Sequence, residues 1–220
     1  MDNRLLKDFL YEQVARVGKA LSSPKRLELL EMLAQGEKAV EAVAADVAID
    51  VKLASAHLKA LKAAHLVQSR RDGKRMLYRL SGDDVAQLGV SVRTVAEEHL
   101  VELTVALQKM VAEPGRLSGM DRKDLMAQAR RGELIVLDVR PKAEFDTAHL
   151  PYARSMPLAE LAQRLSELPH EVEIVAYCRG PFCLMSDAAV TLLRARGYRA
   201  CKTSDGVSEW RAAGLPVDRV

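Results

Sequence analysis

The chain has 220 residues, 49% hydrophobic and 29% charged, with a formal net charge of +3. Its length allows two small domains, and no apolar run approaches the roughly 18 residues that a membrane-spanning helix needs. Residues 1–13 alternate charged and apolar side chains, which argues against a signal peptide, and an odd, sparse set of cysteines argues against a disulfide framework. We therefore expect a cytoplasmic protein with no membrane partner.

The first half is predicted to be helical and to end in a β-hairpin. Periodic apolar residues predict helices over residues 5–21, 24–36, 40–47 and 51–65. Pro24 follows a serine cap, which is a favoured helix start. The last two helices form a helix-turn-helix candidate. Alternating segments around Asp72-Gly73 then predict a hairpin over residues 66–80.

The predicted hairpin is strongly basic. It carries one acidic residue, Asp72, against Arg70, Arg71, Lys74, Arg75 and Arg79. A recognition helix fits the major groove of double-stranded DNA, and a basic ribbon can contact the flanking phosphates. The alternative is a solvated hairpin whose basic edge prevents sheet aggregation. The helix pair and the ribbon together favour DNA binding.

Residues 14–81 resemble the winged helix-turn-helix of the ArsR/SmtB family of bacterial repressors. The resemblance rests on Ala20-Leu21-Ser22-Ser23-Pro24-Lys25-Arg26-Leu27, Ser55-Ala56-His57-Leu58-Lys59-Ala60-Leu61, His65-Leu66-Val67, Asp72-Gly73 and Tyr78-Arg79-Leu80. It implies a homodimer that binds an operator and releases it when an effector binds. The expected DNA-binding residues are Lys52, Ser55, His57, Lys59, Arg70, Arg71, Lys74 and Arg75, with His57 a packing or phosphate contact.

The best-known metal sites of that family need cysteines on the third helix, and residues 38–43 contain none. We therefore expect no resident metal ion or cofactor. His99 lies near Glu97, Glu98 and Glu102, and a solvated acidic face is the preferred interpretation over a zinc site.

A stripe of apolar residues predicts one long helix over residues 85–110. So small a domain offers this stripe no partner, so we expect a homodimer through this helix and the N-terminal one. Pro114 and Gly115 then break the pattern. We place a DNA-binding and dimerisation domain at 1–112, a linker at 113–120 and a second domain at 121–220.

The second domain alternates strands with helices, which predicts a doubly wound parallel α/β sheet. The expected helices cover residues 125–131, 158–168, 187–196 and 208–213, and the expected strands cover 134–139, 174–177 and 198–202.

Cys178 directly follows a predicted buried strand and is the candidate catalytic residue. The candidate active-site loop continues with Arg179, Gly180, Pro181, Phe182 and Cys183. Sites in such folds lie at the C-terminal ends of strands. Loop amides and a helix N-terminus favour thiolate over thiol, so we expect a lowered pKa for Cys178. A buried, inert cysteine is the alternative.

This half resembles the rhodanese domain over about 100 residues. The motifs are Leu137-Asp138-Val139-Arg140, Glu144-Phe145, His149-Leu150-Pro151, the Cys178 loop, Asp205-Gly206, Glu209-Trp210 and Gly214-Leu215-Pro216-Val217. The resemblance implies that Cys178 carries sulfur as a persulfide, while Asp138, Arg140, Glu144 and His149 form a structural polar network. Leu184 stands where related phosphatases have the arginine of Cys-x5-Arg, which favours sulfur over phosphate. Arg179 can still attract an anion such as thiosulfate.

Cys183 either pairs with Cys178 or packs as a small apolar residue, whereas Cys201 is expected to be inert. The leading hypothesis is a transcriptional regulator that acts as a repressor and whose Cys178 senses or carries reactive sulfur or oxidants. The alternative is a sulfurtransferase enzyme whose winged helix serves dimerisation. A third hypothesis is a rhodanese-like domain that binds an anionic ligand or a partner protein without covalent chemistry.

Overall fold

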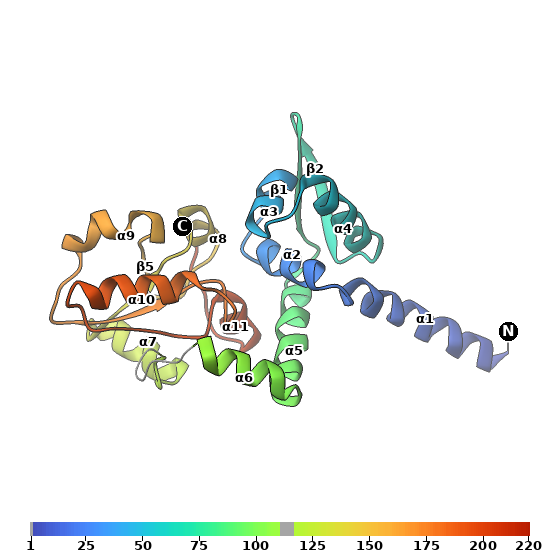
Figure 1. Cartoon of the computed structure of the whole chain (residues 1–220). Coiled ribbons are helices and arrows are strands. Elements are labelled where there is room, and N and C mark those ends of the chain that lie inside the picture. The colour runs from blue at the N-terminus through green and yellow to red at the C-terminus, as the bar shows by residue number, and fades with distance from the viewer. Residues whose placement is uncertain (1, 111–116) are drawn as a thin grey trace. The chain divides into compact units, whose positions relative to one another are not determined.

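The computed structural model describes residues 2–110 and 117–220. The chain divides into two compact units, Met1–Gly89 and Val90–Val220 (Figure 1). The division falls inside one helix, α5 (Asp83–His99). Within the described residues, no helix combines the length and apolar character needed to cross a membrane.

The first unit is a helix-turn-helix followed by a β-hairpin wing. Its elements before α5 are α1 (Asn3–Leu21), α2 (Pro24–Ala34), β1 (Lys38–Ala39), α3 (Val40–Asp46), α4 (Val51–Ala63), β2 (Val67–Asp72) and β3 (Arg75–Leu80). Strand β3 lies between β1 and β2 in an antiparallel sheet. Asp50 caps α4 by accepting a hydrogen bond from the Leu53 amide at 2.8 Å, which orients the candidate recognition helix.

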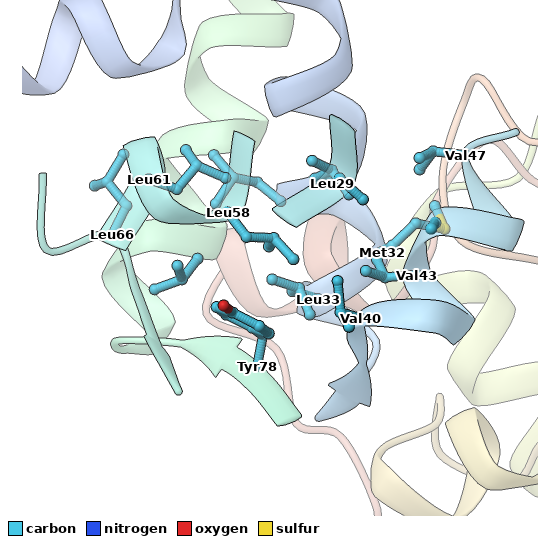
Figure 2. Packing of buried hydrophobic residues seen from close by; sticks show 14 of the residues in the cluster. Leu29, Met32, Leu33, Val40, Val43, Val47, Leu58, Leu61, Leu66 and Tyr78 are labelled. Atoms are coloured by element: carbon cyan, nitrogen blue, oxygen red, sulfur yellow. The ribbon is translucent and has the colours of Figure 1, made fainter. Parts of the chain in front are cut away.

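The core of this unit is made mainly by helices α2, α3 and α4, together with Val67 and Tyr78 of the two wing strands. Leu29, Val43 and Leu58 are fully buried, and Figure 2 shows Tyr78 of β3 pointing into the same cluster. Because the wing contributes to the core, the hairpin is anchored at its base while its basic tip extends away (Figure 1).

The second unit contains a parallel sheet with helices on both faces. Its elements after α5 are α6 (Val101–Met110), α7 (Arg122–Arg131), β4 (Leu134–Asp138), α8 (Lys142–Thr147), β5 (Arg154–Ser155), α9 (Leu158–Arg164), a 3-10 turn (Leu165–Glu167), β6 (Glu173–Tyr177), α10 (Met185–Ala195), β7 (Ala200–Lys202) and α11 (Val207–Ala212). The strand order is β5-β4-β6-β7, and every pair is parallel. The predicted fold class, a winged helix-turn-helix plus a parallel α/β domain, is confirmed.

Alternation along the central strands builds two cores. Leu134 and Val136 of β4 pack with Trp210 on one face, while Ile135 and Leu137 pack with Leu193 on the other. Strands buried on both faces are continuous apolar runs, which is the pattern of this sequence. Both cores meet at β6, so the chain that leaves β6 at Cys178 starts from a rigid support.

The prediction of one long helix over residues 85–110 is wrong. The helix ends at His99 and a second one, α6, begins at Val101. The Thr104 hydroxyl donates to the Glu97 carbonyl at 2.8 Å, satisfying a backbone group that a continuous helix would bond itself. Residues 113–116 of the predicted linker lie outside the described residues, so the placement of that boundary stays a prediction.

Candidate functional site

A disulfide joins Cys178 to Cys183, with their Cα atoms 6.4 Å apart. The loop between them turns tightly, since the Cys183 amide donates to the Gly180 carbonyl at 3.1 Å, and α10 follows at Met185. Cys178 is 2% exposed, whereas Cys183 is half-buried. In this oxidised form, an external thiol therefore reaches the bond from the Cys183 side. The reactivity expected of Cys178 concerns the reduced form and stays a prediction.

Arg179 is held by Glu144 of α8 rather than left open to an anion. Its Nε and Nη2 donate to the two carboxylate oxygens at 3.0 and 2.7 Å, and both side chains are largely buried. The predicted attraction of Arg179 for thiosulfate must therefore compete with this bidentate pair. Leu184 is exposed at the position where a phosphatase arginine would stand.

A buried polar network supports the residue before Cys178. The Tyr177 hydroxyl donates to Asp138, and Arg140 Nε donates to the same carboxylate at 3.0 Å. Burial, reinforced by the Asp138 carboxylate, raises the pKa of Tyr177 well above its ordinary value. Burial opposes the charge of Arg140, but its hydrogen bonds to Asp138 keep its pKa above the ordinary value. These contacts agree with the structural role expected for Asp138 and Arg140.

The other expected members of the network lie nearby in α8 and after it. The His149 ring stacks on Phe145 at a centroid distance of 3.8 Å, and its Nδ1 lies 2.9 Å from the Phe145 carbonyl oxygen. Glu144, in contrast, contacts the cysteine loop itself through Arg179. The Glu144-Phe145 motif indicates a place for Glu144 in the fold but not this contact, because residue spacing says nothing about a partner 35 positions away.

Gly206 presses against the backbone of the cysteine loop. A Cβ atom there would lie 2.6 Å from the Arg179 carbonyl oxygen and 2.7 Å from that of Cys178. The Gly206 amide donates to the Glu209 carboxylate at 2.6 Å, which fixes the start of α11. The Asp205-Gly206 motif signalled this residue in the sequence, but only the packing explains why glycine is needed.

The expected DNA-binding residues lie on α4 and the wing. Lys52, Ser55 and Lys59 follow one another along one face of α4, away from buried Leu58, and both lysines are exposed. His57 is half-buried, and its spacing places it well off that line. The three predicted base-contacting residues therefore share one polar face of α4, whereas His57 does not.

On the wing, Lys74 and Arg75 are exposed at the tip. Arg70 instead pairs with Glu37, its Nε donating to the two carboxylate oxygens at 2.9 and 3.0 Å, and the bonds from Arg70 lower the pKa of Glu37. Arg71 Nε donates to the Gly73 carbonyl at 3.0 Å. The basic residues of the wing therefore differ in how freely they can reach a phosphate.

The fold and the two sites define a winged helix-turn-helix transcriptional regulator with a second, rhodanese-like domain. The model of the bacterial regulatory protein arsR family matches residues 23–69, and that of the rhodanese-like domain matches residues 121–213. The chain belongs to the arsR family of DNA-binding regulators and carries a rhodanese-like domain.

Named relatives match the whole chain or one of its halves. HTH-type transcriptional regulator Rv0324 of Mycobacterium tuberculosis is 46% identical over 96% of this chain and 93% of its own length. A sulfurtransferase of Allochromatium vinosum is 30% identical over 39% of this chain and 78% of its own. A solution structure of a homodimeric winged helix-turn-helix DNA-binding domain from Mycobacterium bovis is 51% identical, covers 46% of this chain and 90% of that one, and has a TM-score of 0.42.

Proposed function

We propose that the chain is a repressor that senses reactive sulfur or an oxidant through Cys178 and changes its operator affinity in response. The observation that carries this proposal is the Cys178–Cys183 disulfide within a DNA-binding regulator. Because a second thiol lies at bonding distance from the sulfur-accepting cysteine, the loop has two states, the dithiol and the disulfide. A regulator acts where the DNA is, so we place it in the cytoplasm.

The proposed chemistry uses a sulfane-sulfur donor such as thiosulfate or polysulfide. The Cys178 thiolate attacks the outer sulfur of thiosulfate, giving Cys178–S–S⁻ and releasing sulfite. The Cys183 thiol then attacks Cys178 Sγ, and the outer sulfur leaves as HS⁻ with the electron pair of the broken bond and the thiol proton. Both cysteine sulfurs are oxidised and the sulfane sulfur is reduced. A cellular dithiol then reduces the Cys178–Cys183 disulfide and is itself oxidised to a disulfide, which returns the loop to the dithiol state.

On the DNA side, we assign base contacts to Lys52, Ser55 and Lys59, and phosphate contacts to Arg71, Lys74 and Arg75 of the wing. Arg70 joins them when phosphate displaces Glu37, and His57 serves as a packing or phosphate contact. Exposure of both α4 lysines and of the wing tip supports this assignment.

We further propose a homodimer that uses α1. This helix exposes apolar side chains that a monomer would leave in water, namely Leu5, Leu6, Phe9, Leu10, Tyr11 and Val14. Val92, Val95 and Val105 of α5 and α6 are also exposed. Contiguous apolar surface of this kind is typical of an interface between chains.

The sensing claim is tested with duplexes selected from a randomised library by the reduced and by the oxidised full chain. Affinity is measured with and without inorganic tetrasulfide for wild type and Cys178→Ser. We expect a 5- to 150-fold change for wild type, corresponding to a coupling of about 1–3 kcal/mol, and none for the variant. Equal affinity in every case would remove sensing and leave DNA binding intact.

Mass spectrometry separates the two chemical steps. After tetrasulfide treatment, Cys183→Ser should hold a gain of about 32 Da on Cys178, because the persulfide has no internal thiol to attack it. Wild type should instead lose about 2 Da as the disulfide forms. A persistent gain of about 32 Da in wild type would contradict the second step.

A sulfurtransferase is the second candidate, favoured by the similarity to the Allochromatium vinosum protein of that name. An enzyme must transfer the sulfur of its persulfide to an external acceptor. Cys183 is close enough to Cys178 to attack the persulfide first and release that sulfur. Rapid, multiple-turnover formation of thiocyanate from thiosulfate and cyanide, dependent on Cys178, would favour the enzyme. A single slow modification would favour the sensor.

A further inference from the structure

Arg93 lies in the part of α5 that belongs to the second unit, and it contacts the cysteine loop of that same unit. Its guanidinium carbon lies 5.7 Å from the centre of the Phe182 ring, which belongs to the loop between the two cysteines. A cation over an aromatic face at this distance is attracted by the ring. Displacement of Phe182 therefore changes the surroundings of Arg93.

The same arginine reaches the other end of the loop through α11. Arg93 Nη2 pairs with Glu209, and the two side chains are only 14% and 6% exposed. Glu209 in turn accepts from the Gly206 amide, and Gly206 abuts the carbonyl groups of Cys178 and Arg179. Arg93 is thus linked to the residue before Cys183 and to the backbone at Cys178.

This pair resists separation because both charges have left water. Breaking a buried ion pair leaves an uncompensated charge, so the partners tend to move together. Arg93 Nε also lies 3.4 Å from Glu97 Oε1 on the same helix. This ion pair holds the guanidinium against α5. A rearrangement of the loop must therefore either carry α5 with it or break these contacts.

We propose that Arg93 is the positioning residue through which the redox state of the Cys178–Cys183 pair acts on α5, the helix that begins at Asp83 in the winged helix-turn-helix unit. This inference rests on the proposed function. The dithiol and disulfide forms hold Phe182 and the Cys178 backbone differently, and Arg93 converts that difference into a displacement of α5. The signal then travels along a continuous helical backbone.

The test measures operator affinity of the full chain, reduced with dithiothreitol or oxidised with inorganic tetrasulfide, on the selected duplexes. The variants are Arg93→Gln and Phe182→Leu, with Arg131→Gln as the control because Arg131 forms an exposed pair with Glu133. We expect Arg93→Gln and Phe182→Leu to keep the reduced-state affinity within threefold of wild type. Their oxidised-to-reduced affinity ratio should fall to threefold or less, while Arg131→Gln keeps the wild-type ratio.

A second measurement distinguishes signalling from a merely structural role. Linkage requires that a tenfold affinity change per protomer shifts the midpoint potential of the cysteine pair by about 30 mV when DNA binds. Arg93→Gln should lose this shift with a lowered thermal midpoint, because Glu209 is left buried without its partner. Phe182→Leu keeps the Arg93–Glu209 pair and should lose the shift with a thermal midpoint close to that of wild type. If Arg93→Gln fails to fold, Phe182→Leu decides the question alone.

The outcomes separate the two proposals. A wild type without any redox-dependent affinity overturns the proposed function. A wild type with redox-dependent affinity, together with a Phe182→Leu or a folded Arg93→Gln that keeps the full ratio, overturns the role of Arg93 and leaves sensing in place.

Discussion

Two arginines that are predicted from the sequence to bind anionic ligands form ion pairs with carboxylates of the protein itself. Arg179 pairs with Glu144 beside Cys178, and Arg70 pairs with Glu37 at the base of the wing. Each carboxylate makes its arginine selective, because an incoming anion must compete with a pair that is already formed. The buried pair at Arg179 is harder to displace than the exposed one at Arg70.

Glu37→Gln should free Arg70 and strengthen DNA binding. We expect affinity for the selected duplex to rise about threefold per protomer. The slope of log affinity against log salt should steepen by about 0.9, since each phosphate contact releases counterions. Titrations at several salt concentrations check this, with Glu133→Gln at an exposed pair outside the wing as the control. An unchanged slope would show that Arg70 makes no phosphate contact.

Cys201 should make the folded state less stable at alkaline pH. Burial, together with the neighbouring Glu173 carboxylate, raises the pKa of its thiol to about 11. The folded state thus favours the neutral thiol. Its contribution to stability is complete below the ordinary cysteine pKa near 9 and is lost as pH rises through about 11.

Thermal midpoints of wild type and Cys201→Ala between pH 8 and pH 11 test this effect. Wild type should lose more stability than Cys201→Ala across about pH 9–11. Only in wild type does unfolding expose a thiol that ionises in this pH range, which favours the unfolded state. Parallel curves over this range would assign the alkaline loss to other groups.

Between elements, a close fit in the second unit lies where the start of α11 meets the chain that leaves β6. The start of α11 lies so near the Cys178 and Arg179 carbonyl groups that no side chain fits at position 206. The geometry of the cysteine loop therefore depends on an element nearly thirty residues further along the chain. Strand β6 fixes the start of the loop, and the residue that begins α11 restricts the position of the loop backbone.

Gly206→Ala should destabilise the second unit by about 1–3 kcal/mol, because the added methyl group forces the loop backbone to move. It should also shift the midpoint potential of the cysteine pair. Gly119→Ala is the matched control, since a Cβ atom there meets nothing within 4 Å. Denaturant unfolding and redox titration measure both effects, and equal behaviour of the two variants would contradict the proposed close fit.

For the whole molecule, the exposed apolar face of α1 supports the proposed homodimer. Leu10 is 55% exposed and Phe9 is 54% exposed, although both are large apolar side chains. Burial of such residues in a dimer would remove them from water on both chains.

Leu10→Glu should raise the dimer dissociation constant by about 100-fold or more, because a charge replaces an apolar contact twice in a symmetric dimer. Ala15→Glu adds the same charge on the opposite, exposed side of α1 and should leave the dimer intact. Sedimentation equilibrium of both variants measures this. A dimer unaffected by Leu10→Glu would place the interface elsewhere.

The local pattern of the chain was sufficient to predict the wing, the second helix of the helix-turn-helix and the strand that ends directly before Cys178. Asp72-Gly73 defines a turn, and the run from Ile174 to Tyr177 defines a buried strand. These signals are encoded by neighbours within a few residues. The break between α5 and α6 escaped prediction because the apolar stripe continues across Leu100, and a hydrogen bond from Thr104 marks it.

By itself, the sequence determined the two fold classes and the position of Cys178 directly after a buried strand, because periodicity, turn residues and motifs are local. Only the tertiary structure decided which charges are already paired, which glycine is required by close packing, and that Arg93, Glu209 and Phe182 meet. Those contacts join residues up to 116 positions apart, and such pairings arise only when folding removes the side chains from water.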